Sequence, residues 1–250
     1  MLLLGSFVPA MAAPIFVSGV SLSSGWLDVN KTYVDDSNLC WAASSSNLLA
    51  YTGWTGGASL DTTAEIFADF KTHWTNQGGH PYVGTYWWFT GTNMMAGQTG
   101  WAQLEGTAQA GLYDAATFDD NYFYDSFKGD SAATVFSELL QLIDQDYGLA
   151  LSIEKYVNDV RYGHSITLWG IDTATGSIYI TDSDDGVTAL KSYHYSGLSL
   201  TDYFGGGWSL TDVTGLELAV SAVPEPASLL LFGVGGIVMG LVRRKGIVGS

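Results

Sequence analysis

Cys40 is the single cysteine of this 250-residue chain, and it lies at the predicted start of a helix, just behind small polar residues. A thiol acts as a nucleophile when it is ionised, and the unpaired N–H groups at a helix N-terminus stabilise the thiolate. The nucleophile also needs a histidine base held by a carboxylate, and donors for the oxyanion that forms on the attacked carbonyl. Cys40 is therefore either the nucleophile of an acyl-transfer site or a small buried side chain.

His164 is the histidine best placed to act as the base. It begins a predicted strand at 164–172, and the next predicted strand, 177–184, ends in an acidic run that contains Asp182 and Asp184. The polar turn TATG predicts an antiparallel pair in which paired residue numbers sum to about 348. His164 then faces Asp184, and Asp182 lies diagonally on the same face. A register slip of one residue would move both aspartates to the opposite face.

The other histidines have no equally clear carboxylate partner in the sequence. His73 lies in a predicted helix, His80 in a glycine-rich loop and His194 after a polar segment. We therefore expect His164 to be the base. The residues then follow the order Cys, His, Asp along the chain, which a cysteine hydrolase of this size can use.

The predicted helices come first along the chain and the predicted strands follow. Helical spacing of apolar residues and capping signals predict helices at 39–52, 62–75 and 131–147, and a short helix or loop at 87–95. Ser37 or Asn38 is expected to cap the first helix and Gly53 to end it. Alternating apolar residues then predict strands at 149–155, 164–172 and 177–184. This order indicates an α+β domain with an antiparallel sheet.

The composition excludes some classes of partner and favours export. The chain has 9 Lys and Arg residues against 25 Asp and Glu residues, a formal charge of −16, which repels nucleic acids and anionic lipid surfaces. Abundant glycine and aromatic residues with only 14% charged residues suit an exported protein rich in strands and loops. A single cysteine cannot form an internal disulfide. No repeat or low-complexity linker interrupts residues 14–222, which predicts one globular domain.

Both ends of the chain look like export signals. Residues 1–13 are apolar and finish in small residues, as a signal peptide does, but they are short and lack a basic start, so we expect a truncated signal. Residues 223–250 contain a Pro-Glu-Pro triplet, an uncharged stretch at 227–242 and then three basic residues. This layout resembles the PEP-CTERM sorting signal of Gram-negative bacteria, whose helix an exosortase-type membrane protease is thought to remove. A plain C-terminal anchor is the alternative, and both place the domain outside the cytoplasm.

These features predict a protein that is exported to the cell surface or the extracellular space of a Gram-negative bacterium. It would be held in the inner membrane only transiently, through its C-terminal segment.

Two segments resemble the catalytic blocks of the IdeS/Mac family of immunoglobulin-degrading cysteine endopeptidases, which have a papain-like fold. They are GWLDVNKTYVDDSNLCWAASSSNLLAY at 25–51 and GHSITLWGIDTATGSIYITDSDDG at 163–186, roughly a fifth of the chain. The family segment G-W-x-D-x-x-K-T-[FY] before the catalytic cysteine is matched by Trp26, Asp28, Lys31, Thr32 and Tyr33.

The resemblance implies a role for each matched residue of the site. Lys31 would help to form the oxyanion hole, His164 would be the base, Asp182 its orienting carboxylate and Asp184 a second supporting carboxylate. The spacing from Lys31 to Cys40 is one residue shorter than in the family, and Trp41 stands where glycine is usual. These departures are expected to tilt Lys31 away or to narrow the cleft.

The predicted function is a secreted cysteine endopeptidase that hydrolyses peptide bonds of an extracellular protein and needs no cofactor. Its partners would be a protein or peptide substrate and the exosortase-type enzyme. Two alternatives stay open: a catalytically silent papain-like binding or matrix protein, and a transglutaminase-like or amidase enzyme that keeps the triad.

Three further sites are weaker candidates. His73 and His80 with nearby acids lack a compact metal-ligand spacing. The run DSDDG at 182–186 faintly resembles a calcium loop, but its glycine comes early and position twelve is Tyr193. The aromatic residues between 82 and 101 fit a carbohydrate-binding platform less well than a core and cleft wall.

Overall fold

The computed structural model describes residues 13–102 and 111–219. Contacts divide the chain into two units, residues 1–218 and 219–250, and every helix and strand described below lies in the first unit. The predicted signal peptide, apart from residue 13, and the predicted membrane segment at 227–242 lie outside the described residues. Within the part that the structure describes, no helix has the length and apolar character needed to cross a bilayer. The predicted domain boundaries therefore stay predictions.

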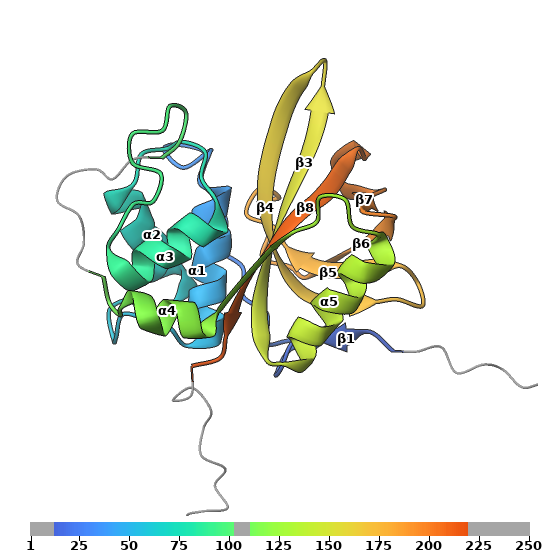
Figure 1. The fold of residues 1–250 in the computed structure, drawn as a ribbon, viewed down its shortest axis with the longest axis horizontal. Helices are drawn as coiled ribbons and strands as arrows, with labels where there is room; N and C mark the ends of the chain where they lie inside the picture. The colour runs from blue at the N-terminus through green and yellow to red at the C-terminus, as the bar shows by residue number, and fades with distance from the viewer. Residues whose placement is uncertain (1–12, 103–110, 220–250) are drawn as a thin grey trace, which may run out of the picture. The chain divides into compact units, whose positions relative to one another are not determined.

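After a two-residue strand, Ile15–Phe16, the first unit continues with a helical part at 40–121, whose helices lie together on one side of the remaining strands (Figure 1). The helices of the described residues are α1 (Cys40–Thr52), α2 (Thr63–His73), α3 (Pro81–Thr90), α4 (Ala115–Asn121) and α5 (Ala132–Asp144), with a short 3-10 turn η1 (Tyr203–Gly205). The predictions of α1, α2 and α5 are confirmed. The helix or loop predicted at 87–95 is instead α3, which Pro81 begins and Gly91 ends in a left-handed conformation.

The start of α1 differs from the prediction. Its N-terminal flanking residue is Leu39, and no side chain caps the helix. The expected capping residues are used elsewhere, because Asn38 and Ser37 both hydrogen bond to Asn76 in the loop after α2. The first N–H groups of α1 therefore stay available for a ligand or an anion. Gly53 ends the helix in the left-handed conformation, as predicted.

The strands form one antiparallel sheet that closes on itself. They are β1 (Ile15–Phe16), β2 (Tyr122–Ser126), β3 (Tyr147–Val157), β4 (Val160–Asp172), β5 (Ser177–Thr181), β6 (Lys191–Ser196), β7 (Ser199–Leu200) and β8 (Trp208–Glu217). Their order is β1-β4-β3-β8-β7-β6-β5, and β5 pairs back with β4, so that strands β3 to β8 make a closed barrel. The predicted α+β class with an antiparallel sheet is confirmed.

The predicted register between β4 and β5 is confirmed at the end that faces the site. Thr167 pairs with Thr181 and Leu168 with Ile180, which both sum to 348, and a bulge changes the sum beyond Leu168. Two details were wrong. The ladder stops at Thr181, so His164 and Asp184 are not paired strand residues. His164 also lies inside β4 rather than at its start, because a tight turn with positive φ at positions 158 and 159 extends the β3–β4 hairpin.

The core has two parts that meet at α1. One lies between the barrel and α5, and the other lies among α1, α2, α3 and α4. Helix α1 is buried along most of its length and contacts β4 and β3 as well as α2 and α3. This position holds the first turn of α1 next to the strand that carries His164.

Candidate active site

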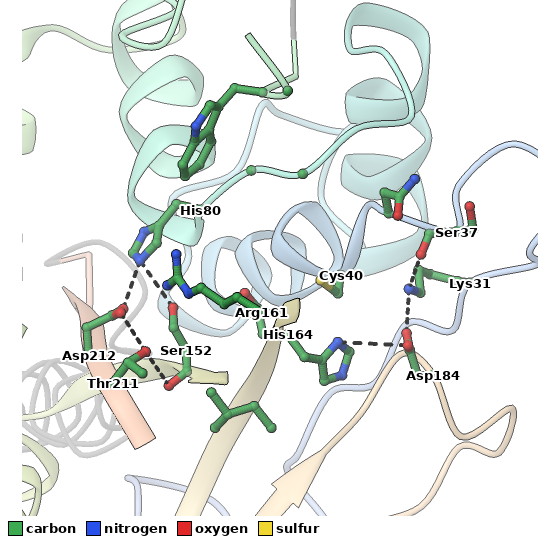
Figure 2. Close-up of a pocket in the computed structure, with 18 residues that line it drawn as sticks. Lys31, Ser37, Cys40, His80, Ser152, Arg161, His164, Asp184, Thr211 and Asp212 are labelled. Atoms are coloured by element: carbon green, nitrogen blue, oxygen red, sulfur yellow. Dashed lines mark hydrogen bonds and ion pairs between the residues drawn. The ribbon is translucent and has the colours of Figure 1, made fainter. Parts of the chain in front are cut away.

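Cys40 is the first residue of α1, is half-buried, and lines a cavity of about 410 Å³. Residues of the helical part and of the barrel both line this cavity, among them Lys31, His164 and Asp184 (Figure 2). Of the five predicted site residues, these four line one space, and Asp182 lies directly behind His164. The structure thus brings together side chains that are separated by more than 120 positions in the sequence.

The thiol of Cys40 and the imidazole of His164 line the same cavity, and each shifts the pKa of the other. Burial alone would raise the pKa of the Cys40 thiol, but the His164 ring, the charge of Lys31 and the backbone N–H of Ser165 bring that pKa below its ordinary value. Burial would lower the pKa of His164, but Cys40 and then Asp182 raise it to about 10. The two shifts together favour a thiolate and an imidazolium over the neutral pair.

Asp182 holds the ring of His164 from the other side. Its Oδ1 lies 2.7 Å from Nε2 of His164 and accepts the N–H of Asp184 at 2.9 Å. Burial raises the pKa of Asp182, but the bonds from His164, Tyr203 and Asp184 lower it further, so the group is a carboxylate. Because Nε2 is bonded to Asp182, Nδ1 is the nitrogen left to exchange a proton with Cys40.

Tyr203 is a site residue that the sequence reasoning missed. Its hydroxyl donates to Oδ2 of Asp182 at 2.5 Å, and its side chain is fully buried. Its ring also stacks near the His164 ring, with centroids 6.4 Å apart. The residue lies in η1, where Phe204 has a φ of 37°, and nothing in the local sequence connects this turn to the acidic run at 182–186.

Lys31 and Asp184 form a second pair beside the thiol. Nζ of Lys31 lies 2.5 Å from Oδ1 of Asp184 and donates to the carbonyl of Ser37 at 2.7 Å, with only 1% of the side chain exposed. Oδ2 of Asp184 lies 3.8 Å from Nδ1 of His164. An ammonium has three donors, so one N–H of Lys31 is left for a ligand in the cavity. The shorter spacing before Cys40 has therefore not taken Lys31 away from the site.

The loop that carries Lys31 is fixed by buried polar contacts. The N–H of Lys31 donates to the carbonyl of Ser183, which ties the loop to the turn that carries Asp184. The carboxylate of Asp36, which is fully buried, accepts the N–H groups of Thr32 and Tyr33. These contacts close the segment 31–36 into a tight bend that places the ammonium near the first turn of α1.

Trp41 does not line the cavity, so the second expectation from the two departures, a narrowed cleft, is wrong. Its ring is fully buried, packs under the chain at Gly79 and donates from Nε1 to the carbonyl of Gln77 at 3.1 Å. It supports the loop that forms one wall of the cavity.

Other histidines also have carboxylate partners, so the expectation that only His164 had a clear one was wrong. His80 lies 2.8 Å from Asp212, and His194 lies 3.0 Å from Asp202 on the exposed side of the barrel. No local signal connects the members of the first pair, because 132 positions separate them.

The weaker candidate sites do not converge on a ligand. Among the described residues, the group with metal-ligand geometry is His164, Asp182 and Asp184, whose ligand atoms lie within 4.8 Å of one another. The buried ammonium of Lys31 on Asp184 would repel a cation there. The run at 182–186 is not a calcium loop in this arrangement, since Asp182, Asp184 and Asp185 turn to His164, Lys31 and Lys191 respectively.

The aromatic segment at 82–101 is mostly interior. Trp87, Trp88 and Phe89 are buried in the helical core, whereas Trp101 lines the cavity. The expectation of a core and cleft wall is confirmed.

Comparisons with known proteins bear on the export signal more than on the site. Residues 222–245 match the PEP-CTERM protein-sorting motif, which confirms that prediction and indicates export. No curated protein matches the chain. The structure of the interpain A cysteine protease of Prevotella intermedia is similar with a TM-score of 0.45 and 9% identity, over 80% of this chain and 94% of that one. A likeness at this level supports no inference about activity.

Proposed function

We propose that the chain is an exported cysteine endopeptidase with a papain-like fold, in which Cys40 is the nucleophile and His164 the base. The observation that carries the proposal is the arrangement at the start of α1, where Cys40 and His164 line one cavity and Asp182 holds the imidazole of His164 by a hydrogen bond of 2.7 Å. The IdeS/Mac resemblance supports the same roles. The sorting motif supports processing by an exosortase-type enzyme.

The chemistry proposed for this site is acyl transfer to water. The Cys40 thiolate attacks a peptide carbonyl, and the oxyanion is held by the free N–H of Cys40 at the first position of α1 and by Lys31. The His164 imidazolium protonates the leaving amine, which breaks the peptide bond and leaves an acyl-enzyme. Neutral His164 then takes a proton from water, whose oxygen attacks the thioester and returns the thiolate–imidazolium pair. Asp182 keeps the ring oriented and stabilises its charge throughout.

Lys31 has a role in this proposal that can be measured. Removal of one oxyanion donor costs about 2.7–4 kcal/mol of barrier, so Lys31→Met should lower kcat by about 10²- to 10³-fold. Lys191→Met is the matched control, because Lys191 pairs with Asp185 at 2.8 Å and does not line the cavity. A kcat for Lys31→Met equal to that of the control would remove Lys31 from the mechanism.

The assignment as a protease is tested with the purified full chain and Cys40→Ala, each incubated with a mixture of proteins whose new N-termini are then sequenced. We expect new termini only with the unsubstituted chain. Identical patterns from both would overturn the assignment. Products in which an amine, in place of water, has accepted the acyl group would instead favour a transferase.

Thiol alkylation separates an active site from a silent scaffold. A thiolate paired with His164 reacts fast with iodoacetamide at about pH 6, and more slowly after His164→Ala. Reaction only after unfolding would favour the alternative of a binding or matrix protein.

A further inference from the structure

The cavity has a second polar end, built from three separate elements. His80 immediately precedes α3, Ser152 lies on β3, and Asp212 lies on β8 directly opposite Ser152 in the sheet. Figure 2 shows these side chains turned toward one another, on the other side of Cys40 from Lys31. Nε2 of His80 lies 2.8 Å from Oδ1 of Asp212 and 3.1 Å from the hydroxyl of Ser152.

The charge of His80 is set by its position before α3. Its Nδ1 accepts the backbone N–H of Tyr82 at 3.1 Å, as a capping side chain does at a helix start. A nitrogen that accepts carries no proton, so the ring is the neutral tautomer with its proton on Nε2, from which it donates to Asp212. His80 therefore contributes a hydrogen bond to this carboxylate and no positive charge.

Asp212 is a carboxylate that has no lysine or arginine partner among the described residues. Burial raises its pKa, but His80 first, and then Ser152 and Thr211, lower it below the ordinary value. Among the described residues, no lysine or arginine forms an ion pair with it. Arg161 also lines the cavity, but it is paired with Glu154 at 2.6 Å. Asp212, Arg161 and Glu154 together carry a net charge of −1, and 12% of the Asp212 side chain is exposed.

We propose that the Asp212 end of the cavity is a specificity site that takes the basic side chain, Lys or Arg, of a peptide substrate. The inference rests on the proposed function, because it concerns the substrate of that same cavity. A cationic side chain supplies the missing counter-charge, and a carboxylate has about four acceptor sites, of which the three neutral donors use only part. A cavity of about 410 Å³ has room for such a side chain beside the main chain at Cys40.

The charge of the whole chain acts in the same direction. A formal charge of −16 raises the local concentration of basic segments and lowers that of acidic ones. Arg161 is the group that would favour an acidic side chain instead, and its ion pair with Glu154 opposes that choice.

The direct test is the cleavage of fluorogenic peptides that differ at a single position in Lys, norleucine or Glu. The ratio of kcat/KM for the Lys and norleucine peptides should be at least about tenfold at one position, which corresponds to about 1.4 kcal/mol. Asp212→Asn should bring this ratio close to one. Asp202→Asn is the matched control, since Asp202 also pairs with a histidine, at 3.0 Å, but on the exposed side of the barrel. Its ratio should equal that of the unsubstituted chain.

A second measurement separates the failure of this proposal from that of the proposed function. Short peptide chloromethyl ketones with Lys or norleucine alkylate Cys40 without a need for turnover. No reaction of either probe with the folded chain would remove the proposed function itself. Equal rates for both probes on the unsubstituted chain would overturn the specificity site and leave the nucleophile in place, even if Asp212→Asn does not fold. A higher kcat/KM for the Glu peptide would overturn the specificity site at Asp212 and indicate that Arg161 binds an acidic side chain instead.

Discussion

Replacement of Tyr203 by Phe tests whether a buried hydroxyl positions the candidate triad. The hydroxyl gives Asp182 Oδ2 a hydrogen bond of 2.5 Å in a fully buried setting, and Oδ1 is already used by His164 and Asp184. A hydrogen bond to a charged group contributes about 1.5–3 kcal/mol, so Tyr203→Phe should lower the free energy of unfolding by that amount. In a domain of this size the midpoint of thermal unfolding should then fall by about 3–12 °C.

The same change has a chemical readout that a loss of packing would not produce. Because the Tyr203 bond lowers the pKa of Asp182, its removal raises that pKa, so Asp182 takes up a proton at a higher pH and then no longer stabilises the imidazolium. The acid limb of the pH profile for iodoacetamide alkylation of Cys40 should move to higher pH.

Tyr193→Phe is the control for Tyr203→Phe. The Tyr193 ring packs on Tyr203 with centroids 5.0 Å apart, and its hydroxyl makes no hydrogen bond to the described residues. Circular dichroism in urea gives the unfolding free energies of both variants. If Tyr203→Phe matches Tyr193→Phe in stability and in its alkylation profile, the positioning role is refuted.

Two further predictions concern the surroundings of the site. Burial, with the nearby carboxylates, raises the pKa of Asp28 from 3.8 to about 7. Between these pH values the folded chain holds a proton on Asp28 that the unfolded chain releases. The contribution of this proton to stability is full below pH 3.8 and is lost as pH rises to about 7. Asp28→Asn keeps an acceptor for the Ala189 N–H. In urea unfolding, this variant should gain stability relative to the unsubstituted chain as pH rises from about 4.5 to 8. A difference in unfolding free energy that stays constant over this pH range would contradict the prediction. A Cβ at Gly79 would overlap the Trp41 ring, so Gly79→Ala should lower the free energy of unfolding by about 1–3 kcal/mol. Gly78→Ala is the control and should change it little, because the nearest atom to a Cβ there lies at 3.7 Å. Equal midpoints of urea unfolding for the two variants would contradict the packing argument.

The parts of the fold that the sequence predicted are those fixed by local signals. The register of β4 and β5 follows from a four-residue turn and from the alternation of side chains, and it was correct at Thr167 and Thr181. The β3–β4 hairpin was underestimated because its tip, Asn158 and Asp159, takes up positive φ between exposed valines that carry no core signal. The short helix α4 and the strands β6 and β7 were missed, since each has at most one buried position. Strand β8 was missed although six of its ten residues are buried.

The same distinction applies to the candidate site. Cys40, His164 and the two aspartates were predictable because a helix start supplies the anion site and one hairpin supplies the base and its carboxylates. Tyr203 and the His80–Asp212 pair were not, because they come together only through the closure of the barrel and the packing of the helical part against it. Residue types alone carry no information about which distant histidine meets which distant acid.

One buried side chain explains how two such different parts of the chain are aligned. Asn47 accepts the N–H of Val29 at 3.2 Å and donates to the hydroxyl of Thr167 at 3.0 Å, with 3% of its surface exposed. It lies two turns after Cys40 on α1, and Thr167 lies on β4 three residues after His164. A buried amide loses its hydrogen bonds if the helix slides or rotates against the strand, and an unpaired polar group there costs about 1–3 kcal/mol. The hydrogen bonds of Asn47 therefore fix the helix that carries the thiol, the strand that carries the imidazole and the loop that leads to Lys31 in one relative position.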